Sequence, residues 1–185
     1  TTGGSTTGGS TTGGSTTGGS TTGGSTTGGS TTGGSTTGGS TTGGSTTGSE
    51  HMVELVGGNS SATYKVTGNT LNVQNDAACV VLYTIDNGET YTKLAATANE
   101  AGGYDFDLTN VPANAVIKIA IQGDFNMDGS VDALDAVMVN RAAAGLLPHN
   151  ELQSQIGHVG GSDALDGLDA LLINRSAAGK YTIAW

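Results

Sequence analysis

The first 49 residues hold only threonine, glycine and serine, and residues 1–45 are nine identical copies of the pentad TTGGS. A segment of this composition has no apolar surface to bury, so it predicts a disordered tether and leaves the folding core to the rest of the chain. The copies show no drift, and His51-Met52 is a pair that cloning sites leave behind, which favours an engineered tether over a natural interdomain linker. Residues 1–52 are therefore assigned to a flexible linker with a cloning scar.

The chain has an acidic balance and a single thiol. It carries 6 Lys and Arg against 16 Asp and Glu, and its basic residues form no run, so we exclude a nucleic-acid partner. Cys79 can form neither an internal disulfide nor a thiolate metal cluster, and its apolar neighbours predict a packed side chain. No stretch reaches the roughly 20 apolar residues of a membrane helix, so we expect no membrane insertion. No signal peptide is visible in this fragment.

Residues 53–122 alternate short apolar runs with glycine and asparagine turns. The expected strands cover residues 62–66, 70–73, 79–85, 91–96, 104–108 and 115–121. The turns between them recur about every 8 to 12 residues, a spacing typical of an all-β sandwich. Asn87-Gly88 is the best candidate for a tight hairpin because that pair accepts positive φ angles. The tyrosines are scattered and no tryptophan occurs here, so we assign this small module no binding or catalytic role.

Residues 124–135 follow the spacing of a calcium-binding loop. Oxygen donors occupy loop positions 1, 3, 5, 9 and 12, and glycine occupies position 6. Ca²⁺ takes about six to eight oxygen ligands, and a glycine permits the sharp bend between donors. The expected ligands are the side chains of Asp124, Asn126, Asp128, Asp132 and Asp135 and the backbone carbonyl of Ser130, with Asp132 direct or water-bridged and Asp135 bidentate.

Two features separate this loop from the loop of a calcium sensor. Position 12 is Asp135 instead of glutamate, and residues 115–121, before the loop, predict a strand where a sensor has an entering helix. Without a first helix, calcium cannot open a helix pair as it does in sensors. We expect a structural ion that relieves the repulsion among the carboxylates, fixes the loop and starts the helix that follows.

The region around and after this loop is duplicated with an offset of 34 residues. Residues 131–145 and 165–179 are identical at nine of fifteen positions, which marks an internal repeat. Each copy predicts a helix that starts at a carboxylate, Asp135 or Asp169, and stops at a glycine suited to a left-handed cap. We expect residues 147–156 to form a short connecting helix.

A duplicated calcium loop and helix after a small β-module resembles the dockerin family with an adjoining X-type module. Residues 123–185 carry the resemblance, and residues 110–114 are similar to the end of X modules. The resemblance implies a small, immunoglobulin-like all-β sandwich over residues 53–122, followed by a small all-α dockerin with loop-helix repeats at about 123–145 and 157–179. It also implies an extracellular or cell-surface protein that binds a cohesin module of a scaffoldin or cell-surface protein, in a cellulosome-like complex that degrades polysaccharides.

The second loop departs from the dockerin pattern at the positions that bind calcium. Positions 1, 3 and 5 are His158, Gly160 and Ser162, and only Asp166 and Asp169 remain as carboxylates in register. Calcium affinity follows the number and charge of the ligands, so we predict one bound calcium, and a second site would have to rely on Ser162, Asp166 and Asp169. Imidazole is a poor ligand for calcium, so His158 is expected to be a hydrogen-bonded loop residue.

The duplicated helices are apolar on more than one face, which a single core-facing stripe does not explain. A seam through which the two helices can pack is formed by Ala136, Val139 and Ala143, with their repeats Ala170, Ile173 and Ala177. The other apolar side chains either complete a small core or form a partner surface. The candidate partner residues are Ala133, Leu134, Val137, Met138, Asn140, Arg141, Leu168, Leu171, Leu172 and Arg175.

The sequence shows no catalytic constellation, since its histidines, His51, His149 and His158, lie in the scar, a linker and the degenerate loop. We therefore expect a non-catalytic, calcium-dependent adaptor that is monomeric until it binds its cohesin. Two other classes stay open. In a carbohydrate-binding or adhesin fragment, the β-sandwich would recognise the ligand and the calcium unit would only be structural. An intracellular calcium sensor would expose apolar surface reversibly with calcium.

Overall fold

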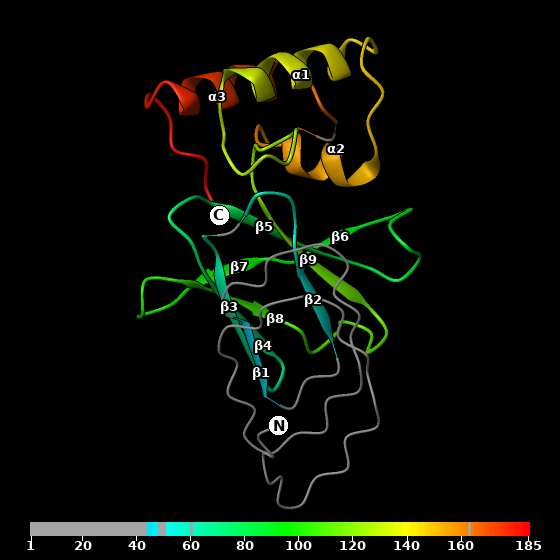
Figure 1. Cartoon of the computed structure of the whole chain (residues 1–185), viewed down its shortest axis with the longest axis vertical. Helices are drawn as coiled ribbons and strands as arrows, with labels where there is room; N and C mark the ends of the chain where they lie inside the picture. Colours follow the sequence, from blue (N-terminus) through cyan, green and yellow to red (C-terminus); the bar gives the residue numbers. More distant parts are fainter. Residues whose placement is uncertain (1–43, 48–50, 60, 163) are drawn as a thin grey trace, which may run out of the picture.

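The computed structural model describes residues 44–47, 51–59, 61–162 and 164–185 (Figure 1). The strands are β1 (Gly44–Thr47), β2 (Met52–Leu55), β3 (Thr63–Thr67), β4 (Thr70–Gln74), β5 (Cys79–Thr84), β6 (Thr92–Lys93), β7 (Ala96–Ala98), β8 (Tyr104–Asp107) and β9 (Val116–Ile121). The helices are α1 (Ala133–Ala143), α2 (Glu151–Gly157) and α3 (Gly167–Ala177). β1 lies inside the segment that we assigned to a flexible linker and pairs with β3, so that prediction was wrong for residues 44–47. For residues 1–43 and 48–50 the predicted disorder lies outside the described residues.

The strands form two sheets, which we call sheet A and sheet B. Sheet A has five strands in the order β1-β3-β4-β8-β7, and sheet B has four strands in the order β2-β9-β5-β6. β1 runs parallel to β3 and β2 runs parallel to β9, whereas the other neighbouring strands are antiparallel. β2 begins at Met52, which pairs with Val116, so sheet B starts at the residue where we expected the linker to end.

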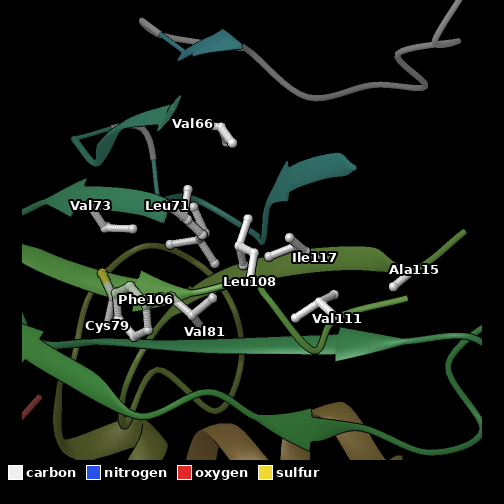
Figure 2. Packing of buried hydrophobic residues seen from close by; sticks show 11 residues of the cluster. Val66, Leu71, Val73, Cys79, Val81, Phe106, Leu108, Val111, Ala115 and Ile117 are labelled. Carbon is white, nitrogen blue, oxygen red and sulfur yellow. The ribbon is translucent and has the colours of Figure 1, made fainter. Parts of the chain in front are cut away.

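The main core lies between the two sheets, where side chains from both sheets fill the space (Figure 2). Alternate residues of each strand point into it, as the period of two in a pleated strand requires. Leu71 and Phe106 of sheet A and Val81 and Ile117 of sheet B are all fully buried in this cluster. Cys79 lies here as the packed side chain that its neighbours predict, and burial raises the pKa of its thiol to about 11.

Sheet B is buried on its outer face as well. Val80 and Leu82 of β5 and Ala120 of β9 alternate with the core residues and pack with Ile156 of α2. Because both faces are covered, β5 and β9 carry continuous apolar runs instead of an apolar-polar alternation. Figure 1 shows α2 lying between the strands and the pair formed by α1 and α3.

α1 and α3 pack side by side and run in opposite directions (Figure 1). The buried residues of this helical core are Phe125, Ala136, Val139, Ala142, Ala170, Ile173 and Ile183. The inner members of the predicted seam are therefore buried between the helices. Its outer members, Ala143 and Ala177, are exposed, and Ala142 is buried in the first helix instead.

Both long helices begin earlier than their sequences led us to expect. α1 follows the N-cap Asp132 and α3 follows the N-cap Asp166. Asp135 and Asp169 are third residues of their helices, where each side chain accepts a hydrogen bond from the backbone N–H of the N-cap and completes a capping box. The predicted helix starts at Asp135 and Asp169 were therefore wrong. The expected connecting helix is α2.

The end of the chain ties the helices to sheet A. Ile183 is buried in the same cluster as Phe125 and packs against Gly123. Two residues later, the indole of Trp185 stacks on the ring of Tyr104 in β8, with the ring centroids 4.3 Å apart. The last residues therefore connect the helical core to the core between the sheets.

The strand predicted at the edge of sheet B differs from the one in the structure. Residues 91–96 were predicted as one strand, but they contribute to β6 in sheet B and to the start of β7 in sheet A. Asn87 and Gly88 do have positive φ angles, 59° and 92°. They lie in a longer loop than a tight hairpin, in which Asp86 accepts hydrogen bonds from neighbouring threonines.

The predicted fold class, an immunoglobulin-like β-sandwich followed by a separate small all-α dockerin, was wrong. The structure has two sheets, with three short helices after the strands. α2 shares a buried cluster with sheet B, and Trp185, after α3, stacks on Tyr104 of sheet A, so the helices and the sheets are joined by shared buried contacts. The described part of the chain is thus one α+β unit in which helices cover one face of a sheet.

Candidate calcium loop and partner face

The loop between β9 and α1, which we call loop one, is organised by two carboxylates that accept hydrogen bonds from its own backbone. Asp124 accepts from the amide N–H groups of Asp128 and Gly129, at 3.1 and 2.9 Å. Asp135 accepts from the amides of Asn126 and Asp132, at 3.0 and 2.9 Å. The backbone of the loop therefore circles the two carboxylates.

The middle of loop one contains two residues in the left-handed region. Met127 has a φ angle of 60° and Gly129 has one of 98°. Gly129 stands at loop position 6, where the sequence predicts a glycine for the bend. For Met127 the same region costs about 1 kcal/mol or more, because its Cβ approaches the following carbonyl oxygen. Other contacts must therefore hold Met127 in place.

The other predicted ligands follow along the same loop. Asn126 donates from Nδ2 to Asp128 Oδ2 at 2.7 Å, and Asp128 Oδ1 accepts from the amide of Ser130 at 3.0 Å. Asp132 caps α1 and accepts from the amide of Leu134 at 2.6 Å. The side chains at positions 3 and 5 are thus bonded to each other, and the one at position 9 is bonded to the start of the helix.

Loop one carries buried negative charge. Asp124 is 2% exposed and Asp135 is 1% exposed, although carboxylates are rarely buried to this degree without a partner. Burial raises the pKa of Asp124 to about 6, and the charges of Asp135 and Asp128 add to this rise, against the lowering effect of its two amide donors. Burial also raises the pKa of Asp135. Among the described residues, no lysine or arginine forms an ion pair with either carboxylate.

Loop one has the types of donor that calcium binds, although its side chains are not gathered around one point. In the described ranges, no three His, Cys, Asp or Glu side chains are gathered closely enough to hold a metal ion. The donors are nevertheless all hard oxygens, and the amide of Asn126 and the carbonyl of Ser130 belong to the set besides the carboxylates. Two buried carboxylates without a basic partner also favour a cation. The residues therefore fit a calcium ion in kind and in position along the loop.

The second loop, between α2 and α3, keeps the carboxylate at position 12. Asp169 is fully buried and accepts from the amides of Val159 and Gly160, at 2.8 and 2.6 Å. Nε2 of His158 lies 3.4 Å from the hydroxyl of Ser162, so the histidine is a loop residue within reach of a hydrogen bond. Among its described residues, this loop closes around one buried carboxylate, and it has no acidic residue at positions 1, 3 or 5.

A shallow groove runs between α1 and α3. It is lined by Ala133, Ala136, Val137 and Asn140 of α1 and by Gly167, Ala170, Leu171 and Asn174 of α3. Each residue of the first set corresponds to one of the second set at the offset of 34 residues. Because the helices run in opposite directions, equivalent positions of the repeat form both walls, and the groove has approximate two-fold symmetry.

Most of the candidate partner residues are exposed, and four of the exposed ones line this groove. The exposed ones are Ala133, Leu134, Val137, Asn140, Arg141, Leu168, Leu171 and Arg175. Leu134 and Val137 are each 53% exposed, and their counterparts Leu168 and Leu171 are 46% and 50% exposed. Met138 and Leu172 are half-buried, and Met138 packs against the helical core. The structure thus brings eight of the ten residues to the surface and gives Met138 a place in the core.

No motif in the sequence singles out Gln122, which stands between β9 and the first proposed ligand. It is 3% exposed, and its Nε2 donates to the carbonyl oxygens of Gln155, Ile156 and His158 at 3.2, 2.6 and 3.1 Å. Gln122 therefore fastens the start of loop one to the end of α2. A polar residue at the end of an apolar strand was the one available signal for this role.

No family model, curated protein or solved structure matches this chain. The likeness to dockerins therefore depends on the residues of the repeat alone. None of the helices in the described part of the chain is long and apolar enough to span a membrane. Function has to be inferred from loop one and from the groove.

Proposed function

We propose that this chain is a non-catalytic adaptor that binds a cohesin module through α1 and α3, with calcium holding loop one. The apolar groove between the two helices carries this proposal. Val137 and Leu171 line it, Leu134 and Leu168 directly follow lining residues in the chain, and all four are about half exposed. Large apolar side chains that gather on one exposed face are typical of interaction surfaces, whereas scattered ones are not.

Exposed arginines on the two helices favour a protein partner with an apolar centre and an acidic rim. Arg141 and Arg175 occupy equivalent positions of the repeat and are exposed, and Asn140 and Asn174 line the groove itself. Arginine is enriched among the residues that contribute most to binding, and charges at a rim select partners of opposite charge. A cohesin is the partner that the resemblance to dockerins implies.

Calcium has a structural role in this proposal. The residues that would hold it are Asp124, Asn126, Asp128, Ser130, Asp132 and Asp135. A bound ion supplies positive charge to the buried carboxylates and so fixes the loop. Asp132 caps α1 and Asp135 lies in its first turn, so the start of the helix belongs to the same structure as the ligands. The direction of α1, and with it one wall of the groove, depends on the order of the loop.

The proposed partner implies where the chain acts. A cohesin of a scaffoldin or of a cell-surface protein would receive the chain outside the cell or on its surface. The chain would act as a monomer that joins or anchors a complex for the degradation of polysaccharides.

Retention of the full chain by immobilised cohesins, compared with retention by insoluble polysaccharides, tests this function. We expect at least one cohesin to retain the chain in calcium and to release it in excess chelator. The double substitution Val137→Asp with Leu171→Asp puts a charge on each wall of the groove, and we expect binding to weaken by about a hundredfold or more. The control is Ile85→Asp, at a side chain that is 58% exposed in the loop between β5 and β6, and it should leave binding unchanged.

Other results would favour the other two classes. Retention by a polysaccharide without any cohesin partner would support a carbohydrate-binding or adhesin fragment. A folded chain that exposes and hides apolar surface as calcium is added and removed, measured with a hydrophobic dye, would support a calcium sensor.

A further inference from the structure

The connection between β2 and β3 places two consecutive glycines on the backbone of loop one. The amide of Gly58 donates to the carbonyl oxygen of Met127 at 3.2 Å. A Cβ atom on Gly57 would lie 2.8 Å from the carbonyl carbon of Met127, and one on Gly58 would lie 2.7 Å from the amide nitrogen of Gly129. Real Cβ atoms essentially never approach other atoms to under 3.0 Å, so these two stretches of backbone lie at a distance that only glycine allows.

Met127 is held through its side chain as well as through its carbonyl group. The side chain packs, together with Val56, against the buried cluster on the outer face of sheet B. Val56 directly precedes Gly57, so the segment that bonds the carbonyl group of Met127 also joins the cluster into which its side chain packs. These contacts offset the cost of the left-handed backbone at Met127, a cost that a glycine at this position would not have.

The contact falls at loop positions 4 to 6, a segment flanked by the proposed ligands Asn126 and Ser130. Asn126 precedes the held segment, and Asp128 lies within it. The amides of Asp128 and Gly129 are also the donors that orient Asp124. A shift of this segment would therefore displace Asn126, Asp128 and the two amides that orient Asp124 together. Fixing it before the ion arrives removes an ordering cost that would otherwise oppose binding.

The second loop offers an internal comparison. Gly161 stands at the position that corresponds to Met127 and is also left-handed, with a φ angle of 78°. It is exposed, and a Cβ atom there would meet nothing within 4 Å. The loop with the full set of donors is thus the one whose left-handed position is packed against a neighbouring segment.

We infer that Gly57 and Gly58 are positioning residues for calcium, an inference that rests on the proposed function of loop one. The glycine turn beside sheet B holds positions 4 to 6 of the loop in the form that binds the ion and so sets its calcium affinity. The sheets are then part of the calcium site although they supply no ligand.

Calorimetric titration of the full chain with calcium tests this role with a matched pair of substitutions. Gly57→Ala and Gly68→Ala each put a side chain on a left-handed glycine, with φ angles of 63° and 56°. Nothing lies within 4 Å of a Cβ atom at Gly68, whereas one at Gly57 meets the backbone of Met127. We expect Gly57→Ala to weaken calcium binding by roughly tenfold or more and Gly68→Ala to change it by less than about twofold.

Two further measurements separate loss of calcium affinity from loss of the fold. Urea unfolding in excess chelator gives the stability of each variant without the ion. Gly58→Ala adds the same kind of clash at a residue that is not left-handed, so it introduces the contact with loop one without the backbone strain of a left-handed alanine. We expect Gly58→Ala to weaken calcium binding to a similar degree. If Gly57→Ala does not fold, Gly58→Ala tests whether the glycine turn sets the calcium affinity.

The outcomes are distinct. Unchanged affinity in the Gly57 and Gly58 variants, or an equal loss in Gly68→Ala, would overturn the role of the glycine turn and leave the calcium loop intact. A wild-type chain that takes up no calcium would overturn the proposed function itself, and the role of the turn with it.

Discussion

Gln122 is a single side chain that joins three parts of the molecule. Its amide nitrogen donates to three carbonyl oxygens at the end of α2, while Nζ of Lys93 in β6 lies 3.4 Å from its amide oxygen. Gln122 also stands two residues before Asp124, the first proposed ligand. Buried carbonyl groups that lose their donor cost about 1–3 kcal/mol, so this position should be sensitive.

We expect Gln122→Leu, which keeps the approximate size of the side chain, to lower the free energy of unfolding by about 1–3 kcal/mol. Urea unfolding followed by far-ultraviolet circular dichroism measures this change. The control is Gln155→Leu, because the amide of Gln155 only bonds Glu151 within α2, and we expect a change within about 0.5 kcal/mol. Equal effects of the two substitutions would show that the contact between loop one and α2 contributes little.

The element that repeats in this chain is a loop followed by a capped helix, and its two copies differ in the loop. Both helices have an aspartate N-cap with a capping box, and each is followed by a left-handed glycine, Gly145 at φ 70° and Gly179 at φ 66°. Only the first copy has carboxylates at loop positions 1 and 5. The helices are thus stabilised alike by local bonds, while the response to calcium should be confined to the first copy.

The N-caps provide a prediction with an internal control. Asp132→Ala and Asp166→Ala each remove one N-cap, and without calcium each should destabilise the chain by about 1 kcal/mol. Asp132 alone belongs to the proposed ligands of loop one. Added calcium should therefore increase the loss of unfolding free energy, relative to the wild type, in Asp132→Ala and leave that loss unchanged in Asp166→Ala. Urea unfolding with calcium and with chelator measures both, and an identical response of the two variants would contradict a single ion in loop one.

Elements that depend on local chemistry were predictable from the sequence. The predicted positions of β3, β4 and β8 agree with the structure to within about a residue at each end, because alternation and turn residues are local signals. Gly145 and Gly179 end the helices as expected. The helix starts were wrong because the capping box puts the aspartate N-cap three residues before the carboxylate that we took as the first residue.

Features that depend on contacts between distant segments were not predictable in the same way. Residues 79–85 were expected only as a strand of an all-β sandwich, although a continuous apolar run is the pattern of a strand covered on both faces. That run was the signal that helices would lie on sheet B. The donor spacing of loop one can be seen in the sequence, but its contact with Gly57 cannot, because it joins segments about 70 residues apart.

Across the whole molecule, buried clusters connect the sheets to the proposed partner face without a break at a domain boundary. The core between the sheets adjoins the cluster of sheet B with α2, and the helical core lies beyond it. Trp185 closes this arrangement by returning the chain end to sheet A. Loop one lies at the junction, so its order should affect the groove on one side and the contact with the sheets on the other.

The central claim is that one ion, held between Asp124 and Asp135, fixes the shape that a partner protein binds. Calorimetric titration of the full chain with calcium tests it most directly. We expect a stoichiometry close to one ion per chain, with binding lost in Asp124→Asn, which keeps the shape of the side chain and removes its charge. A stoichiometry close to two, or no uptake of calcium by the wild-type chain, would contradict it.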